Sequence, residues 1–396
     1  MAGAMPGVPG RRGPVGIIGA GPAGARAAEL LAAGGWEVLL FDPKAPWEKP
    51  CGGGIPAHGF IHFPELRELE GRGRWARRAR LIGPDGAELV VETGAPILLV
   101  DRRILSAYQL GRAEVAGARR VRCRILDVTR AEHGWRLSGD DGRAYDVAYL
   151  IGADGATSRM RRLLAPDFRP RLTPTRGRFV PVGAGADPEI VVWFPPDFRG
   201  YVWEFPRGRM WSVGVCHLDH GVGKSRLEGV LGEHVAARGG SMEHRVYGHP
   251  IPLPNPGDYD RPEWFGGEDW ALCGDAAALV DPISGEGIHH ALRSGQLAAR
   301  ALLETGSLAA YRGFLAAEVL PELRKAAEYA SRFYERGFVE ALLRVCGRGR
   351  RMRGVLADVM TGLQSYRTLR LRTAWAYVLD GFPAPSTLVP LVKFFR

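Results

Sequence analysis

Lysine is rare in this chain of 396 residues: five lysines stand among 53 basic residues, and the other 48 are arginines. With 43 acidic residues the formal net charge is +10. Such a bias can reflect the base composition of a genome, or it can serve attraction to anionic membrane surfaces or acidic substrates. Because no zinc-finger, RNA-recognition or helix-turn-helix pattern accompanies the charge, we do not expect a nucleic acid as partner.

Cysteine and long hydrophobic runs are also scarce. The five cysteines are scattered, odd in number and never spaced as a CxxC pair, which argues against a disulfide framework, a zinc site or an iron–sulfur cluster and fits a reducing cytoplasm. No stretch approaches 18 uncharged apolar residues, so we expect no membrane-spanning helix. Residues 1–13 lack the apolar core of a secretory signal and are interpreted as a flexible tail.

The remaining composition is that of a globular protein, with 46% apolar and 24% charged residues. The length exceeds that of one typical core and predicts two or three domains. Short apolar runs that lead into glycine-rich turns and helical patterns occur in both halves of the chain. Residues from about 171 to 264 are rich in proline and in alternating patterns typical of antiparallel strands, and the pattern is helical from Ser307 onward.

The first structured segment has the pattern of a nucleotide-binding unit. A buried strand at Val15–Gly19 is followed by GxGxxG, by a helical pattern closed by two glycines, and by a second strand that ends in Asp42. Gly19 permits the tight turn, Gly21 lets the backbone approach a pyrophosphate, and Gly24 allows close packing of helix and strand. The helix N-terminus offers N–H groups to phosphates, and Asp42 can accept hydrogen bonds from a ribose. The motif alone leaves FAD and NAD open. The cofactor-binding residues predicted in this unit are Gly19, Gly21, Pro22, Ala23, Gly24, Asp42 and Lys44.

Two later motifs separate these alternatives. Asp154-Gly155-x-x-Ser158-x-x-Arg161, and Gly274-Asp275 followed by Pro282 and GEG, resemble the second and third fingerprints of flavoproteins of the aromatic-hydroxylase type. The resemblance implies that Asp275 bonds the ribityl or pyrophosphate side of FAD and that a helix start faces the pyrimidine end of the flavin, where it stabilises negative charge. It also implies a flavin-contacting arginine at Arg102, with Arg103 as competitor. The cofactor residues carried over are Arg102, Asp154, Gly155, Gly274, Asp275, Pro282, Gly285, Glu286, Gly287 and Ile288.

Two further segments narrow the resemblance. Cys51-Gly-Gly-Gly-Ile-Pro and Tyr201-Val-Trp-Glu-Phe-Pro206, together with GEGI, resemble geranylgeranyl reductases, flavoenzymes that saturate isolated double bonds in polyprenyl chains. The similarity extends from about residue 14 to 303. It implies an FAD-dependent reductase that transfers hydride from the reduced flavin N5 to an apolar, isoprenoid-like substrate. Because no second GxGxxG is present, NAD(P)H or a ferredoxin is expected as a transient electron donor.

The residues of these segments suit such chemistry. Gly52, Gly53 and Gly54 carry no side chains, so a flat ring and an apolar chain can approach the backbone, and we predict these three glycines to be cofactor-binding residues as well. Cys51 can donate a proton to the carbon opposite the one that receives hydride, or it can simply pack as a small apolar residue. Side chains alternate along a strand, so three aromatic residues fall on one face and either line an elongated cavity or form ordinary core. The predicted substrate-binding residues are Tyr201, Trp203, Phe205 and Pro206.

The chain departs from the family pattern at two places. Phe198 stands where the family usually has proline, and His289-His290 stand where it more often has tyrosine or other uncharged residues. His289 lies at the start of a predicted helix beside the flavin, so it is a second candidate for proton transfer, with packing as the alternative. These departures bear on the substrate more than on the chemistry.

The segment Arg344–Arg372 carries eight arginines and one acidic residue, interleaved with apolar residues and followed by aromatic residues that include Trp375, Phe394 and Phe395. This composition suits peripheral attachment to a membrane, and it equally suits a helical cap over the substrate domain.

These observations predict an α/β protein with a discontinuous, doubly wound FAD-binding domain (14–75, 97–168 and 262–305). A substrate-binding α+β domain with a mainly antiparallel sheet (76–96 and 169–261) and a helical C-terminal region (306–396) complete it. The expected location is the cytoplasm, with peripheral contact at the inner membrane surface as an option. The alternatives are an FAD-dependent monooxygenase, a flavin-dependent halogenase, and a flavoprotein that serves as a binding module without turnover. A quinone-linked electron-transfer flavoprotein is disfavoured by the missing cysteine cluster.

Overall fold

The computed structural model of the chain describes residues 13–181, 189–208, 210–218, 222–237, 245–335, 337–382 and 394. Of the tail predicted over residues 1–13, only Gly13 is among them. The last part of the predicted helical region, including Phe395, also lies outside the described residues.

The first sheet has five parallel strands in the order β18-β10-β1-β2-β6. The first strand of the chain lies in the middle, and the chain winds outward to both sides, which is the arrangement of doubly wound nucleotide-binding sheets. All residues of β1, β2 and β10 are buried, as in parallel strands covered on both faces. The strands are β1 (Val15–Ile18), β2 (Val38–Phe41), β6 (Arg119–Val121), β10 (Tyr149–Gly152) and β18 (Trp270–Leu272).

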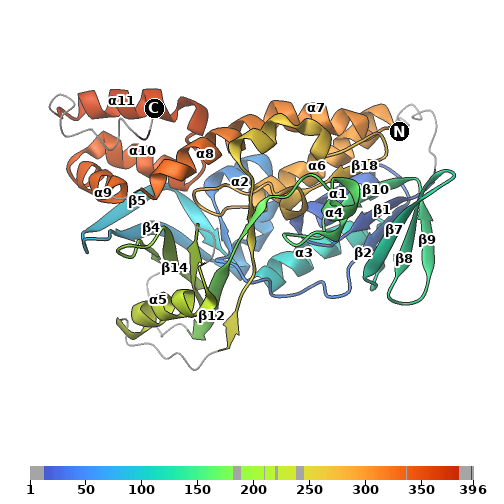
Figure 1. Ribbon diagram of the computed structural model, residues 1–396, viewed down its shortest axis with the longest axis horizontal. Helices are drawn as coiled ribbons and strands as arrows, with labels where there is room; N and C mark the ends of the chain where they lie inside the picture. Colours follow the sequence, from blue (N-terminus) through green and yellow to red (C-terminus); the bar gives the residue numbers. More distant parts are fainter. Residues whose placement is uncertain are drawn as a thin grey trace.

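Helices cover one face of this sheet and a small antiparallel sheet covers the other (Figure 1). α1 packs on β1 and β2 and against α3 and α6, while Leu137 of β8 lies beside Gly16 of β1 on the opposite face. Pro22 begins α1 and Gly34 ends it, the usual positions of proline and glycine at helix ends. The elements are α1 (Pro22–Ala33), α3 (Arg102–Val115), α4 (Arg159–Leu164), α6 (Ile288–Thr305), β7 (Ile125–Ala131), β8 (Gly134–Gly139) and β9 (Ala144–Val147).

The second sheet has eight strands in the order β16-β12-β15-β14-β13-β4-β5-β3, antiparallel except for the parallel pair β13–β4. α5 (Lys224–Ala237) packs on β12 and β15 at its outer face, and a two-stranded sheet of β11 (Arg171–Thr173) and β17 (Ile251–Leu253) lies beside it. The strands are β3 (Gly54–Ile55), β4 (Arg74–Ile82), β5 (Glu88–Leu99), β12 (Thr175–Pro181), β13 (Ile190–Trp193), β14 (Gly200–Arg207), β15 (Met210–His217) and β16 (Val246–Tyr247).

The C-terminal part is helical and lies over the face of the second sheet opposite α5 (Figure 1). α9 and α10 contact β5, and α11 packs on α8 and α10. We name α8, α9, α10 and α11 together the helical cap. A helical cap is one of the two interpretations open for the basic segment. The remaining helices are α2 (Ala57–His62), α7 (Ala309–Glu318), α8 (Leu320–Phe333), α9 (Phe338–Arg348), α10 (Arg350–Met360) and α11 (Tyr366–Leu379).

The predicted fold class, α/β with a second sheet and a helical C-terminal region, is confirmed. The domain boundaries stay a prediction. β3 belongs to the edge of the second sheet although residues 54 and 55 were assigned to the first domain, because its backbone pairs with Leu98 and Leu99 of β5.

Gly295 provides a test of the contact between α1 and α6. A Cβ at Gly295 would collide with the carbonyl oxygen of Ala23, which is backbone and cannot move aside. Gly295→Ala should therefore lower the free energy of unfolding by about 1–3 kcal/mol, as overpacking does. Gly313 of α7 is the matched control, because it faces open space and Gly313→Ala should raise stability by about 0.5–1 kcal/mol through helix propensity. Urea titration of both variants measures the difference, and equal effects would contradict the packing argument.

Candidate functional site

A single continuous cavity of about 930 Å³ extends from the β1–α1 turn, past the loop that contains Cys51, to the helices of the C-terminal cap. Its volume is at the upper end of the range for small-molecule sites in proteins. Both sheets and the helical cap contribute to its walls, so residues far apart in sequence meet here.

The glycines of the β1–α1 turn have different surroundings. Gly19 has a φ of +103°, and a Cβ there or at Gly24 would collide with backbone oxygens of Ala153 or Gly19. Gly21, in contrast, has no atom within 4 Å of its Cβ position and lines the cavity, as do Pro22 and Ala23. Gly19 and Gly24 thus fix the turn, and Gly21 leaves room above it.

The carboxylate of Asp42 lies at the end of β2 and lines the cavity. Its Oδ2 accepts the N–H of Ala20 at 2.9 Å, and its Oδ1 accepts those of Lys44 and Ala45 at 2.7 and 2.8 Å. A carboxylate has about four acceptor positions, so about one remains for a ligand. Lys44 itself is exposed and its ammonium lies over Trp47, not in the cavity wall.

The second motif holds the third in place. The carboxylate of Asp154 accepts N–H groups of Arg159 and Met160 and the hydroxyl of Ser158, so it caps α4. The buried guanidinium of Arg161 donates to the carbonyl oxygens of Asp275 and Ala276 at 3.2 and 3.0 Å. Asp154 and Gly155 still line the cavity at its edge.

Asp275 faces the cavity with Gly274 and forms an ion pair with Lys49, whose Nζ lies 2.5 Å from Oδ2. Burial raises the pKa of Asp275, but the charge and hydrogen bond of Lys49, together with the electrostatic effects of His249 and Arg102, outweigh burial and hold that pKa below its ordinary value. The carboxylate is therefore ionised. Nearby, burial lowers the pKa of His249 to about 4, so that imidazole is neutral.

The start of α6 lies at the cavity wall, with Gly285, Glu286, Gly287 and Ile288 in contact with the open space. Glu286 Oε1 accepts the backbone N–H of His289 at 2.8 Å, and Glu286 Oε2 lies 3.6 Å from His290 Nε2. Burial raises the pKa of Glu286 above its ordinary value. The turn before it is held by Asp281, whose Oδ1 accepts N–H groups of Ile283 and Ser284.

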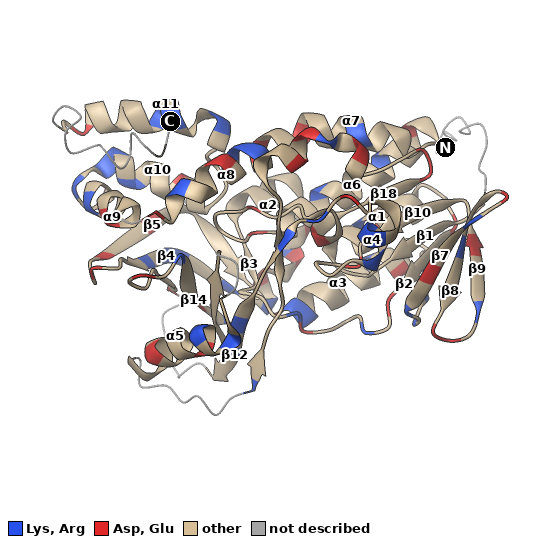
Figure 2. Cartoon of the chain, viewed as in Figure 1, with Lys and Arg blue, Asp and Glu red and all other residues tan. Residues whose placement is uncertain are grey.

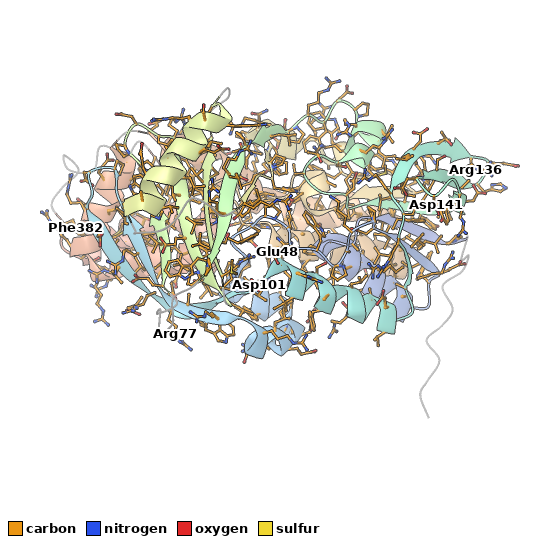
Figure 3. The ribbon with its side chains drawn as sticks, turned by 90° about the horizontal axis from the view of Figure 1, so that it is seen from below. Glu48, Arg77, Asp101, Arg136, Asp141 and Phe382 are labelled. Atoms are coloured by element: carbon orange, nitrogen blue, oxygen red, sulfur yellow. The ribbon has the colours of Figure 1, made fainter. Side chains whose placement is uncertain are left out.

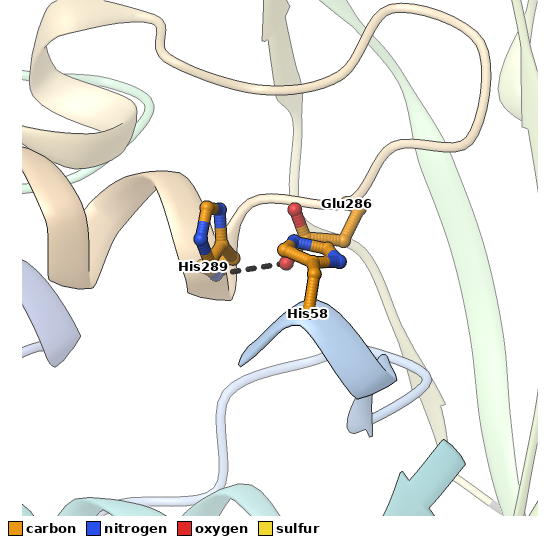
Figure 4. Close-up of side chains that lie close together, drawn as sticks. All are labelled: His58, Glu286 and His289. Carbon is orange, nitrogen blue, oxygen red and sulfur yellow. Dashed lines mark hydrogen bonds between the residues drawn. The ribbon is translucent and has the colours of Figure 1, made fainter. Parts of the chain in front are cut away.

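A cluster of histidines adjoins this helix start (Figure 4). The ligand-type atoms of His58, Glu286 and His289 lie within 4.8 Å of one another, and the rings of His58 and His289 are 4.0 Å apart. His289 Nε2 is 2.8 Å from Nδ1 of the exposed His62, whereas His289 Nδ1 is buried without a hydrogen-bond partner. Burial is the main cause that lowers the pKa of all four histidines, the fourth being His290. The imidazoles are neutral at pH 7, and each can donate and accept a proton.

The loop that contains Cys51 is held from beneath by a buried arginine. Arg207 is 1% exposed; it donates to Glu48 Oε1 at 2.8 Å and lies 3.6 Å from Asp101. The two acidic residues lie close together near the middle of the molecule (Figure 3). Glu48 also accepts the N–H groups of Arg102 and Arg103 at the start of α3, so one ion-pair network joins the loop, α3 and β14.

The three glycines after Cys51 make room chiefly for protein atoms. A Cβ on Gly52 would lie 2.6 Å from the ring of Phe205, and one on Gly53, whose φ is +77°, would meet Val100 and Arg207. Gly54 has only ordinary contacts. The loop is therefore pressed against β14, while its outer side lines the cavity.

Cys51 lines the cavity and is half-buried. Its Sγ accepts the N–H of Gly53 at 3.3 Å. Burial raises the pKa of the thiol, but the charges of Arg102 and Lys49 together with the Gly53 N–H outweigh it, and the net pKa is lowered. The other four cysteines are buried, and the pKa of Cys216, Cys273 and Cys346 is raised to about 12. Cys51 is therefore the acidic thiol of the described part of the chain.

Tyr201, Trp203 and Phe205 of β14 all line the cavity. Trp203 Nε1 donates to Ser212 at 3.2 Å, and the Ser212 hydroxyl donates to the carbonyl oxygen of Cys51 at 2.9 Å. Ser212 also lies 2.9 Å from the hydroxyl of Tyr247. The aromatic wall is thus tied to the Cys51 loop by side chains that the sequence did not single out.

The far end of the cavity is apolar. Ile190 and Val192 of β13, and Phe194 directly after this strand, lie on one face by strand alternation. Residues of the helical cap lie opposite. The α10 residues follow an i, i+3, i+4 spacing, which places them on one helix face. The cap residues that line this end are Phe333, Tyr334, Leu342, Leu343, Leu356, Val359, Met360 and Leu363.

The structure brings most of the predicted site residues together around this cavity. Both predicted catalytic residues, Cys51 and His289, line it, and so does Arg102, whose buried Nε has no hydrogen-bond partner. Four predicted residues do not line it, because they face the protein or solvent: Gly24, Lys44, Pro206 and Pro282. Sequence reasoning predicted a helical cap but not that its residues line the cavity, and it missed Lys49, Ser212, Tyr247, His58, His62 and His249 as site residues. Of these residues, Lys49 is the one that a sequence motif could have indicated, because it stands in the segment directly before CGGG.

Comparison with known proteins shows the family to which the chain belongs. It is 32% identical over 321 residues to the chloroplastic geranylgeranyl diphosphate reductase of Oryza sativa subsp. japonica, covering 74% of this chain and 67% of that protein. It is 29% identical to digeranylgeranylglycerophospholipid reductase 2 of Methanopyrus kandleri, covering 81% of each. The chain belongs to the geranylgeranyl reductase family of FAD-dependent oxidoreductases. No protein-family model matches it.

The fold agrees with this geranylgeranyl reductase assignment. A crystal structure of a geranylgeranyl bacteriochlorophyll reductase-like protein from Thermoplasma acidophilum superposes with a TM-score of 0.73 at 18% identity, over 96% of this chain and 99% of that one. Of the two departures from the family pattern, Phe198 is buried against His217 and His289 belongs to the histidine cluster at the cavity wall. Among the described residues, no helix combines the length and apolar character needed to cross a bilayer.

Arg207 offers a test of the network that holds the Cys51 loop. Arg207→Met removes the cation that faces two acidic groups in a buried place, so it should lower the free energy of unfolding by about 3 kcal/mol. Arg136→Met is the control, because the Arg136–Asp146 pair is more than half exposed and should contribute little to stability. Figure 3 shows that this pair's Arg136 lies far from Glu48. Denaturant titration compares them, and similar small losses would show that the buried network does not stabilise the loop.

Proposed function

We propose that this chain is an FAD-dependent reductase that saturates carbon–carbon double bonds of an isoprenoid chain. The observation that carries the proposal is the continuity of the cavity, which joins a nucleotide-type turn to an apolar end through the acidic thiol of Cys51. The two relatives that cover most of the chain are both named as reductases of geranylgeranyl compounds. They favour reduction over the hydroxylase and halogenase alternatives.

The residues of the first half fit FAD. Open space above Gly21 suits a pyrophosphate, the remaining acceptor position of Asp42 suits a ribose, and the orphaned Nε of Arg102 lacks an acceptor that a flavin carbonyl would supply. Asp275 and the start of α6 would hold the remaining part. When bound and reduced, FAD supplies the hydride for one carbon of the double bond.

The apolar half fits an extended hydrocarbon chain. The aromatic wall of β14, the β13 residues and the cap helices offer an elongated surface with few polar groups. A hydrocarbon chain that fills this end would extend toward the Cys51 loop, which lines the same cavity. Such a site binds a substrate through its hydrocarbon part and leaves the head group for the cavity mouth.

Cys51 is the proposed proton donor to the second carbon. The positive charges of Lys49 and Arg102 make the thiol more acidic, and a more acidic thiol transfers its proton more readily. The histidine cluster supports a second role. Nε2 of the buried His289 lies 2.8 Å from Nδ1 of the exposed His62, so these two neutral imidazoles can pass a proton from solvent to the cavity wall. The ring of His58 lies 4.0 Å from that of His289. His289 is thus the alternative donor.

The electron donor and the membrane contact belong to the same proposal. The sequence has one GxGxxG motif, which supports NAD(P)H or a ferredoxin acting as a transient reductant. An isoprenoid lipid is held in a bilayer, which supports peripheral contact between this chain and a membrane surface.

The function is tested without oxygen. Purified flavoprotein is reduced with dithionite and mixed with geranylgeranyl diphosphate in detergent, while flavin absorbance and product mass are followed. We expect reoxidation of the flavin together with a mass gain of two hydrogens per saturated bond. A flavin that stays reduced until air is admitted, followed by an oxygenated or halogenated product from aromatic compounds, would contradict the reductase assignment.

The pH dependence of the same assay tests Cys51. Activity requires the protonated thiol, so the rate should fall as pH rises through its pKa, and because that pKa is lowered the fall should begin below the pH of an ordinary thiol. Cys51→Ser should reduce the rate of product formation by about 10²–10⁴-fold and remove the alkaline limb. Cys123→Ser, a buried thiol outside the cavity wall, is the control and should change neither. If the alkaline limb of the pH–rate profile stays unchanged in Cys51→Ser, Cys51 is not the proton donor and His289 becomes the candidate.

A further inference from the structure

The outer side of α11 carries a stripe of exposed apolar side chains. Leu371, Trp375, Val378 and Leu379 are 67%, 68%, 68% and 54% exposed. Their spacing of i, i+4, i+7 and i+8 places them on one face of the helix. We name these four residues the α11 ridge. An amphipathic helix with its apolar face turned outward marks an interaction surface.

The charged side chains of α11 itself are all basic. α11 contains three arginines, Arg367, Arg370 and Arg372, and no acidic residue. Arg370 and Arg372 flank Leu371, so one lies on each side of the ridge. Three acidic groups that contact α11 or its ends are already bonded: Asp358 to Arg372, Asp380 to backbone N–H groups of Arg351 and Met352, and Glu322 to the hydroxyl of Ser365 and the N–H of Tyr366. Figure 2 shows basic residues on α9, α10 and α11 with few acidic ones among them.

The α11 ridge adjoins the mouth of the cavity. Gly362, Leu363 and Arg367 line the cavity and are also exposed, so the cavity reaches the surface at the turn that leads into α11. His62 of α2 and Ala317 of α7 are exposed cavity residues as well. From Arg367 to Leu379 the helix extends about 18 Å, so the ridge and the mouth share one element.

We propose that the α11 ridge docks this protein on an anionic lipid bilayer. The apolar side chains enter the boundary between head groups and acyl chains, Arg370 beside the ridge and Arg367 at the mouth bind lipid phosphates, and the cavity mouth faces the membrane. An isoprenoid lipid then passes from the bilayer into the cavity without crossing water. The docking stands on the exposed residues alone, whereas the passage of substrate rests on the proposed function.

The charges favour a bilayer over a second copy of the chain. Two copies related by a twofold axis would bring the same surface together, and with it the arginines of both helices, without an acidic residue on either α11 to pair with them. An anionic bilayer offers phosphates to the arginines and hydrocarbon to the ridge at the same time.

Vesicle flotation tests this docking. The holoprotein is mixed with phosphatidylcholine vesicles, with and without 30% phosphatidylglycerol as the chosen anionic fraction, in about 0.1 M salt. We expect flotation with the anionic vesicles, weakened at about 1 M salt because the charges are screened. Leu371→Glu and Trp375→Glu should each weaken vesicle binding about tenfold or more, and Arg370→Gln should weaken it to a smaller extent.

Matched controls carry the same changes elsewhere. Val115→Glu alters a 91% exposed residue on α3, and Arg119→Gln alters an exposed arginine on β6; both should bind vesicles like the unaltered chain. Neither Leu371 nor Trp375 lines the cavity, so their variants should reduce substrate dispersed in detergent at the normal rate and fail on substrate held in vesicles.

Two outcomes would overturn the docking proposal: an unaltered chain that does not float with anionic vesicles, or ridge variants that float as well as it does. Light scattering decides the remaining case, because a dimer that Leu371→Glu converts to a monomer would assign the ridge to a second copy. If the unaltered chain binds vesicles but forms no product in detergent, the proposed function fails while the docking stands.

Discussion

The structure depends on how one loop is held between two sheets. Gly53 accepts the N–H of Val100 at 3.0 Å, adopts a positive φ, and lies on the side chain of Arg207. Arg207 in turn bonds Glu48, which also bonds the start of α3. α3 packs on α1 beside the first sheet, and β14 belongs to the second sheet. The network therefore fixes the distance between the nucleotide end and the apolar end of the cavity. Without it, Cys51 would have no defined position relative to either.

The cavity wall changes from charged side chains at the nucleotide end to hydrocarbon side chains at the other end. Lys49, Asp275 and Arg102 stand at the nucleotide end, neutral imidazoles follow, and hydrocarbon side chains complete the wall. The ion pair with Lys49 helps to hold the pKa of Asp275 below its ordinary value despite burial. The same charges lower the pKa of Cys51, so the groups that would hold a cofactor also prepare the thiol. In the proposed function, cofactor binding and proton transfer would therefore depend on the same small set of charges.

Local patterns predicted the parts of the molecule that local physics determines. Glycine spacing and buried strand runs identified the β1–α1 turn and the central sheet, and alternation identified the aromatic face of β14. The residues that were missed make contacts across long separations: Arg207 meets Glu48 across 159 positions, and Ser212 meets Cys51 across 161. No periodicity marks such pairs. The roles of motif residues were also ambiguous. The carboxylates of Asp154 and Asp42 use much of their hydrogen-bonding capacity on nearby backbone N–H groups, so these residues hold the fold as well as lining the cavity.

The helical cap explains why the basic C-terminal segment supported two interpretations. Its helices bury Leu356 and Val359 toward the cavity on α10, yet expose Leu371 and Trp375 on α11. One composition thus serves an inner wall and an outer surface, and only the three-dimensional arrangement divides them. The turn between α10 and α11 packs on His58 and reaches the mouth, so the element that exposes the ridge also contacts the histidine cluster.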